Sequence, residues 1–318
     1  MPNRDYKIDF MRMLGTLLVM LSHVLPPNFI QNIRTFDVVM LIYISALSFN
    51  ITYKTDVSLK QYLKKRFKKL IIPTYILLAI IFGLSVLLCL ITNRQNPFDT
   101  GTIIHSFLFL NNGIGYIWIS RVYFEIAIFS YFVKKLLLLR KTVRNIFLLF
   151  IGLVITTITL MGPQIYGNNV IIDSYFLEVI PYFIVVLLGL LVANNQIKSG
   201  IIVFVSFILI TGHAVYNNAF DPNMYKYPPN LYYLSYGLLV SIILYNISWG
   251  YNSYIEWFSK NSFSIYLAHI PILLGLNLLS EKITVIDKWY IKYVFIATIT
   301  TIIIKFYQII KEKTYGNF

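Results

Sequence analysis

Apolar segments of about 20 residues, separated by short polar stretches, recur along the whole chain. An α-helix needs about 20 such residues to cross the hydrocarbon core of a bilayer. We therefore expect about ten membrane-spanning helices, at residues 8–25, 36–53, 70–92, 114–133, 145–162, 176–193, 200–216, 231–248, 262–279 and 290–309. The apolar stretch from Thr102 to Leu110 is too short to span and predicts an interfacial or re-entrant helix.

The composition supports the same fold class. The chain is 58% hydrophobic and only 13% charged, whereas soluble domains carry about 25% charged residues. A transmembrane barrel would show short alternating segments instead of long apolar runs. We expect an all-α, polytopic integral membrane protein of the cell (plasma or inner) membrane, with residues 1–318 forming a single domain because every loop is short.

The net charge of +14 would suit a nucleic-acid partner, but its distribution argues against one, because the basic residues cluster beside the apolar segments. With the N-terminus inside, the expected outer loops carry only Arg34, Arg94, Lys226, Lys282 and Lys288, and the spans carry Arg12, Arg121 and Lys292. The other 19 of the 27 lysines and arginines lie on the inner side. This asymmetry predicts an even number of spans, both termini in the cytoplasm and contact with anionic membrane lipids.

Two ionisable residues lie inside the first apolar segment, where a charge costs about 2.5 kcal/mol or more. Arg12 and His23 are eleven residues apart, or three helical turns plus about 20°, so they share one helix face about 16 Å apart. His23 is suited to accept and return a proton near neutral pH. The alternatives are a hydrogen-bonded structural histidine and an arginine that reaches the interface and pairs with Asp9.

A basic run, residues 64–69, directly precedes the third expected span. Arg66 and Lys69 are three residues apart, so they share a helix face and are suited to bind the phosphates of a polyanion. Pro73 would let the helix bend there. The simpler explanation for such a run is anchoring at the cytoplasmic side of the membrane.

Two further sites carry charge. Arg121 and Glu125 are four residues apart within the fourth expected span. They form either a structural ion pair or a second polar wall of a cavity whose first wall carries Arg12 and His23. Asp37, at the start of the second span, either orients the ring of His23 or caps its own helix. His269, a lone histidine before a proline, is interpreted as structural.

The spacing of the acidic and histidine residues predicts no metal site. Cys89 is the only cysteine, so a disulfide within the chain and a cysteine-based metal site are both excluded.

Four segments, Arg4 to His23, Thr35 to Ala46, Arg66 to Pro73 and Phe263 to Pro271, together resemble the membrane acyltransferase-3 family, whose bacterial members O-acetylate cell-surface polysaccharides and related glycans. The first has an Arg, ten intervening residues and a His. The second has Ala46 where a Gly is usual. The third has Arg-x-x-Lys in place of Arg-x-x-Arg, and the fourth resembles a late Ser-Ile-Tyr-Leu-x-His segment.

The resemblance implies acetyl-CoA or another acyl-CoA as the cytoplasmic donor, and a glycan or lipid-linked sugar as the acceptor on the far side. Arg66 and Lys69 would hold the CoA phosphates, although Lys69 lacks the bidentate fork of an arginine. Arg12 would lie on the route of the pantetheine arm. His23 would act either as a general base or as a nucleophile that takes the acyl group. The alternative function is a transporter or flippase of a lipid-linked sugar or small solute, because a charged interior within about ten helices also describes that class.

Overall fold

The computed structural model describes residues 4–53, 57–93, 95–280, 283 and 287–315. All the named secondary-structure elements within these ranges are helices, so the all-α prediction is confirmed. The chain forms two compact units: unit 1 comprises Met1–Leu41 and Ile243–Phe318, and unit 2 comprises Ile42–Ile242. Three of the basic residues on which the predicted topology rests lie outside the described residues: Lys54, Arg94 and Lys282.

Unit 1 contains the helices from both ends of the chain. They are α1 (Tyr6–Ser22), α2 (Asn28–Arg34), the first turn of α3 (Asp37–Thr52), the end of α11 (Leu231–Asn246), α12 (Ser253–Ser280) and α13 (Trp289–Tyr315). Helix α1 packs along α12, and α12 packs on α13.

Unit 2 contains the helices of the middle of the chain. They are the rest of α3, α4 (Leu59–Thr92), α5 (Thr100–Phe107), η1 (Gly115–Ile117), α6 (Trp118–Leu137), α7 (Lys141–Ile165), α8 (Val170–Ile172), η2 (Asp173–Leu177), α9 (Ile180–Ala193), α10 (Ser199–Asn217), η3 (Pro222–Tyr225) and most of α11.

Eight helical segments in the described ranges are long and apolar enough to cross a membrane. They are Asn28–Thr52, Leu59–Thr92, Gly115–Leu137, Lys141–Ile165, Val170–Ala193, Ser199–Asn217, Ser253–Ser280 and Trp289–Thr314. The other two expected spans correspond to α1 and α11, which have 17 and 16 residues. The structure thus supports about eight candidate spans, and a total of ten stays a prediction. As expected, α5 is a helix too short to span, with 8 residues.

Three helices expose most of their apolar surface. In α7, α10 and α13 only 17%, 17% and 11% of the most apolar window is buried, and large side chains such as Phe150, Phe204 and Phe306 are exposed. Contiguous exposed apolar surface of this extent is rare on a soluble monomer. It suits contact with lipid chains, so the chain is a multi-pass membrane protein.

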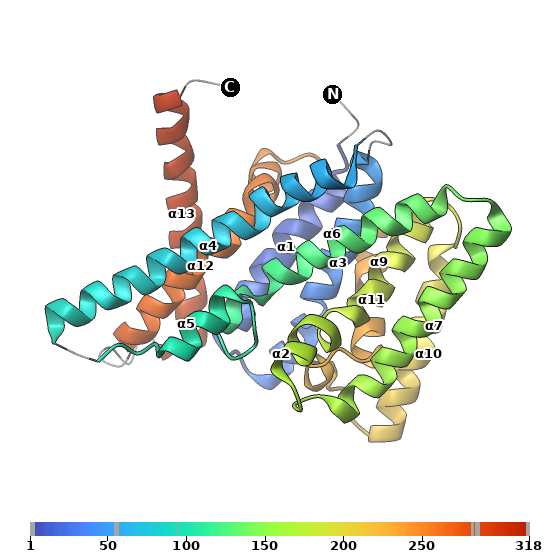
Figure 1. Cartoon of the computed structure of the whole chain (residues 1–318), viewed down its shortest axis with the longest axis horizontal. Coiled ribbons are helices and arrows are strands. Elements are labelled where there is room, and N and C mark those ends of the chain that lie inside the picture. The colour runs from blue at the N-terminus through green and yellow to red at the C-terminus, as the bar shows by residue number, and fades with distance from the viewer. Residues whose placement is uncertain (1–3, 54–56, 94, 281–282, 284–286, 316–318) are drawn as a thin grey trace. The chain divides into compact units, whose positions relative to one another are not determined.

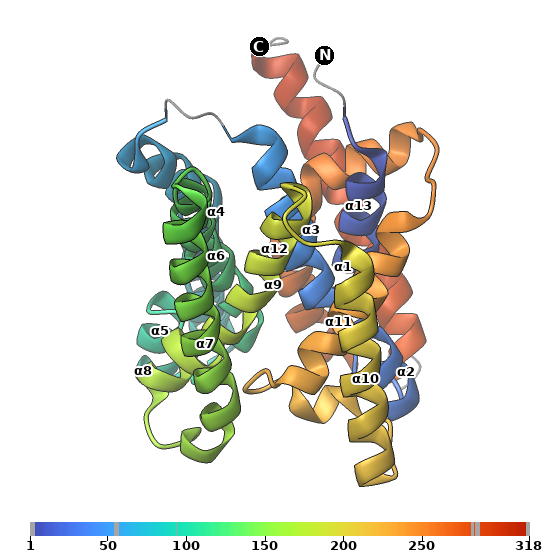
Figure 2. The same cartoon turned by 90° about the vertical axis from the view of Figure 1, so that its right-hand side faces the viewer.

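Both ends of the described chain lie at the same end of unit 1 (Figures 1 and 2). At the start of α1, Arg4 forms an ion pair with Glu256 of α12 at 3.4 Å. Next to Glu256, Trp257 Nε1 donates a 2.6 Å hydrogen bond to Gln308 near the end of α13. Whether this end faces the cytoplasm stays a prediction.

In unit 2, polar contacts between helices hold α4, α6 and α9 in place. Helix α4 has 34 residues and is about 51 Å long (Figure 1). Thr74, which follows Pro73 within this helix, donates to Ser120 of α6 at 3.0 Å. Lys134 of α6 donates to Asn50 of α3 at 2.5 Å and to Asn194, the residue that ends α9, at 2.7 Å. An ammonium group at three helix C-termini also interacts favourably with their dipoles.

Candidate functional site

His23 is the residue at which α1 ends. Its backbone N–H still bonds to Met20 O at 3.2 Å, but the helix stops there. Leu25 then adopts a left-handed conformation (φ 53°), and Pro26 and Pro27 follow. A proline disfavours the helical conformation of the residue before it. Pro26 and Pro27 therefore prevent α1 from continuing beyond this point. His23 therefore lies at a helix terminus and not within the span.

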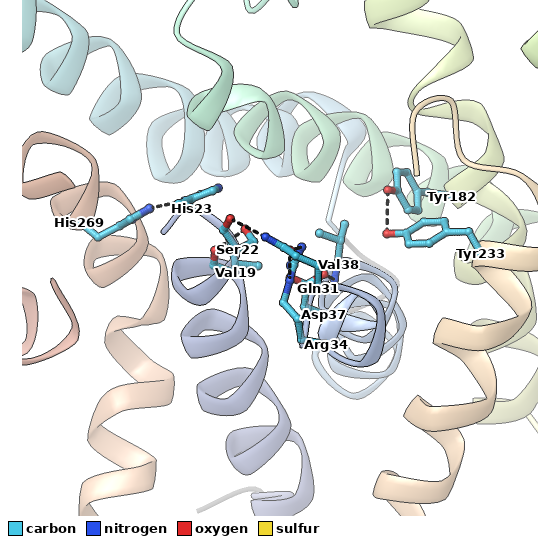
Figure 3. A network of polar contacts seen from close by, with 10 residues as sticks. All are labelled: Val19, Ser22, His23, Gln31, Arg34, Asp37, Val38, Tyr182, Tyr233 and His269. Atoms are coloured by element: carbon cyan, nitrogen blue, oxygen red, sulfur yellow. Dashed lines mark hydrogen bonds and ion pairs between the residues drawn. The ribbon is translucent and has the colours of Figure 1, made fainter. Parts of the chain in front are cut away.

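The ring of His23 meets the ring of His269 from α12 (Figure 3). Nδ1 of His23 lies 2.8 Å from Nε2 of His269. The ring planes are within 10° of each other and the centroids are 5.0 Å apart, about the hydrogen-bond length plus the two ring radii. The rings are therefore edge to edge in one plane, the geometry of a hydrogen bond between the two nitrogens. His269 is fully buried.

The backbone fixes the direction of this hydrogen bond. Nδ1 of His269 meets the carbonyl oxygen of Tyr266, and a carbonyl oxygen only accepts, so Nδ1 of His269 carries the hydrogen. In the neutral ring Nε2 of His269 is then the acceptor, and Nδ1 of His23 is the donor. Nε2 of neutral His23 consequently carries the lone pair that acts as a base or nucleophile.

The pairing with His269 was missed by the sequence interpretation, which took this histidine as structural. The two residues are 246 positions apart, so no local spacing connects them. The available signal was the position of His269 in the last segment of the family resemblance.

Arg12, one of the predicted site residues, also contacts α12. Nη1 of Arg12 donates to Ser259 Oγ at 3.1 Å, and Ser259 in turn donates to Asp9 at 2.7 Å. Arg4 binds the same buried carboxylate at 2.6 and 3.0 Å. Arg12 and His23 thus contact the same neighbouring helix, as their spacing predicts, and in the same order along both helices. Helices α1 and α12 therefore run in the same direction.

Asp37 lies at the start of α3 and is completely buried. Its carboxylate accepts from Arg34 Nη1 and, at 2.7 Å, from the backbone N–H of Val38. Arg34 also donates to Gln31 at 2.8 and 2.6 Å, and Gln31 Nε2 donates to the carbonyl of Ser22 at 3.4 Å (Figure 3). This chain of contacts leads from Asp37 to the residue before His23. The expectation that Asp37 orients the ring of His23 stays a prediction.

Arg66 and Lys69 lie one turn apart on α4, in unit 2. The guanidinium of Arg66 lies over the ring of Tyr62, 5.1 Å from its centroid, and Nε donates to the Tyr62 hydroxyl at 3.1 Å. Arg66 is half-buried and Lys69 is exposed. Because Arg12 and His23 belong to unit 1, a cavity that joins all four residues stays a prediction.

A second group of buried charges surrounds Arg121 of α6. The expected ion pair with Glu125 is present at 3.9 Å, but Glu178 is closer, at 3.2 Å. Arg121 also donates to the carbonyl of Phe109. Sequence analysis missed Glu178, although a carboxylate inside a predicted span was itself a signal.

Glu178 accepts two further hydrogen bonds from neutral groups. Asn111 Nδ2 donates to Oε1 of Glu178 at 2.6 Å, and the Tyr166 hydroxyl donates to the same atom at 2.7 Å. Burial, with the adjacent Glu178 carboxylate, raises the pKa of Tyr166, which keeps its hydroxyl protonated and donating. Among the described residues, no three His, Cys, Asp or Glu side chains are grouped to bind a metal ion.

Comparison with known protein families identifies this chain's family. A family model described as an acyltransferase domain (acyltransferase 3) matches residues 5–307. The matched range includes every site residue described above except Arg4. No curated protein and no solved structure matches the chain.

Proposed function

Because this chain belongs to the acyltransferase 3 family, we propose that it transfers an acetyl or other acyl group from cytoplasmic acyl-CoA to a hydroxyl of a cell-surface polysaccharide or its lipid-linked precursor. The observation that carries the assignment of the reactive residue is the hydrogen bond between His23 and His269. It presents Nε2 of His23 as the basic atom at the more exposed end of a chain of hydrogen bonds that begins at the buried His269.

In the first version of the reaction, His23 is a general base. Nε2 takes the proton of the acceptor hydroxyl while the hydroxyl oxygen attacks the thioester carbonyl carbon. The C–S bond then breaks, and His23 returns the proton to the CoA thiolate. The positive charge on His23 is stabilised by its hydrogen bond to Nε2 of His269, as a partner stabilises the imidazolium in other acid/base sites.

In the second version, His23 is a nucleophile. Nε2 attacks the thioester carbonyl, the C–S bond breaks and CoA leaves as its thiolate, so the acyl group is carried on the imidazole. The acceptor hydroxyl then attacks the acyl carbon, the C–N bond breaks, and the freed Nε2 of His23 takes the hydroxyl proton. Loss of this proton from His23 balances the thiolate of the released CoA, which becomes the thiol. Both versions need the same protonation state of His23.

The other predicted residues have supporting roles in this proposal. Arg66 and Lys69 bind the phosphates of CoA, and Arg12 lies on the route of the donor, held by Ser259. Asp37 acts through Arg34 and Gln31 on the end of α1, which makes it a positioning residue. Arg121 and Glu125 supply a second polar region.

Mass analysis of surface glycans tests the proposal. Glycans from cells that produce the wild-type protein should carry one acyl group more per modified unit than glycans from cells without it. His23→Ala should lower this modification by about 10²- to 10⁴-fold, the usual contribution of an acid/base residue. Equal amounts of folded, inserted wild-type and variant protein are the control. Full modification by the variant would exclude His23 from the chemistry.

A further inference from the structure

One nitrogen of the buried Arg121 guanidinium has no hydrogen-bond partner within the described part of the chain. Arg121 is 3% exposed, and its Nη atoms donate to Phe109 O and to Glu178. Its Nε is buried and makes no hydrogen bond. Buried polar groups are nearly always paired, so a charged donor left unpaired calls for an explanation such as a ligand or an ordered water.

A carboxylate oxygen close to this nitrogen is also unsatisfied. Oε1 of Glu125 is buried without a hydrogen-bond partner and lies 3.9 Å from Nε of Arg121. This distance is too long for a direct hydrogen bond. A single oxygen about 2.8 Å from both atoms would form an angle of about 90° between them, so one hydroxyl fits as acceptor from Nε–H and donor to Oε1.

The backbone around Arg121 is irregular at two places. Phe109, whose carbonyl accepts from Arg121, adopts a left-handed conformation (φ 53°), which is rare for a bulky residue. Asp173–Leu177 forms a π-helical turn, and the guanidinium carbon of Arg121 lies 5.1 Å from the ring centroid of Tyr175 in this turn. Such irregularities concentrate at functional sites. Here Phe109 and the π-helical turn both contact the side chain of Arg121.

We propose that Arg121 Nε and Glu125 Oε1 bind a hydroxyl of a sugar ring, and that this pair is an acceptor-binding subsite. One guanidinium lies between two carboxylates, Glu125 and Glu178, so the group disfavours a phosphate or carboxylate ligand. A hydroxyl both accepts and donates, which matches the two unsatisfied atoms. Access requires a rotamer change of Glu125, whose side chain is 21% exposed. The assignment of the sugar to the acceptor rests on the proposed function.

The test uses the purified full-length protein and three variants. Glu125→Leu removes both acceptor oxygens at similar volume, whereas Glu125→Gln keeps an amide oxygen that accepts a hydroxyl proton. Glu312→Leu makes the same change at an exposed position of α13 and is the control. The probe is surface glycan extracted from cells that lack this protein. One assay measures glycan binding, and a second measures the KM for glycan and the KM for acetyl-CoA.

We expect Glu125→Leu to weaken glycan binding and raise the glycan KM by about ten- to a hundredfold, the effect of losing a hydrogen bond to a charged group. The KM for acetyl-CoA should not change, and Glu125→Gln should weaken binding by only about threefold. If Glu125→Leu does not fold, the loss of about threefold expected for Glu125→Gln decides the question. An unchanged glycan affinity and glycan KM for that variant would overturn the subsite.

The remaining outcomes also distinguish the subsite from the proposed function. Wild-type binding by folded Glu125→Leu would mean that an ordered water bridges the pair, which is then structural. No glycan binding by the wild-type protein would also overturn the subsite. Glycan binding that depends on Glu125 but is not followed by acetyl transfer would refute the proposed function and leave the subsite standing.

Discussion

The hydrogen bond between His23 and His269 decides which nitrogen of His23 is basic. Because Tyr266 O accepts from Nδ1 of His269, both rings donate through Nδ1, and in each neutral ring Nε2 carries the lone pair. A free histidine would populate both tautomers. The buried partner therefore fixes one tautomer and one ring orientation of His23, which a single histidine at a helix terminus would not have.

We expect His269→Leu to lower acyl transfer by about a hundredfold, because the ring of His23 would lose the partner that orients it. Gln at this position still accepts from Nδ1 of His23, so His269→Gln should recover part of the rate. The measurement is initial rate with acetyl-CoA and glycan. The matched control is His105→Leu in α5, outside this pair. Equal rates for His269→Leu and wild type would show that His269 is only structural.

Ser259 links Arg12 to Asp9, so it holds the arginine by one hydrogen bond. We expect Ser259→Ala to raise the KM for acetyl-CoA by about fivefold, the value of one ordinary hydrogen bond, and to leave the glycan KM unchanged. Ser280→Ala, at the other end of α12, is the control. An increase in the glycan KM alone would remove Arg12 from the donor route.

At the scale of elements, the corner between α1, α2 and α3 rests on a buried ion pair. Arg34 and Asp37 are 4% and 0% exposed, and Arg34 continues the contacts through Gln31 to the end of α1. Removing one partner of a buried pair leaves an uncompensated charge, which costs more than removing both.

We therefore expect Asp37→Asn to destabilise the protein by about 3 kcal/mol or more. The double variant Arg34→Gln/Asp37→Asn should recover a large part of this loss because no unpaired charge is left. Thermal unfolding of the detergent-solubilised proteins measures both. A double variant less stable than Asp37→Asn would contradict this account of the corner.

Hydropathy predicted which segments are helical, but not the residue at which each helix begins. Helix α4 begins at Leu59, eleven residues before the expected span, because Ser58 caps it and the basic run continues the helix. An apolar run marks only the part of a helix that faces hydrocarbon. The left-handed Phe109 and the π-helical turn at 173–177 depend on tertiary contacts, so no local pattern reveals them.

The sequence likewise pointed to some residues of the candidate site and not to the residues that contact them. Arg12 and His23 were found because ionisable residues inside an apolar segment are conspicuous. Their partners Ser259 and His269 lie on a helix 246 or more residues away in the chain, and only the fold brings them together. A single sequence therefore indicates the candidate reactive residue, His23, but not the side chain that contacts its ring.

At the scale of the whole molecule, the ends of α1 and α13 lie together in unit 1, so both termini should face the same side of the membrane. The distribution of lysine and arginine predicts that this side is the cytoplasm. Reporters active only in the cytoplasm, fused separately to each terminus, should both be active. Activity at one terminus only would contradict an even number of spans.

The central claim is that His23 moves an acyl group from acyl-CoA to a glycan hydroxyl. The most direct measurement incubates purified protein with acetyl-CoA labelled in the acetyl group and with glycan from cells that lack the protein. Wild-type protein should transfer label to the glycan, and His23→Ala should transfer about 10²- to 10⁴-fold less. Transfer of label by His23→Ala at the wild-type rate would contradict the account.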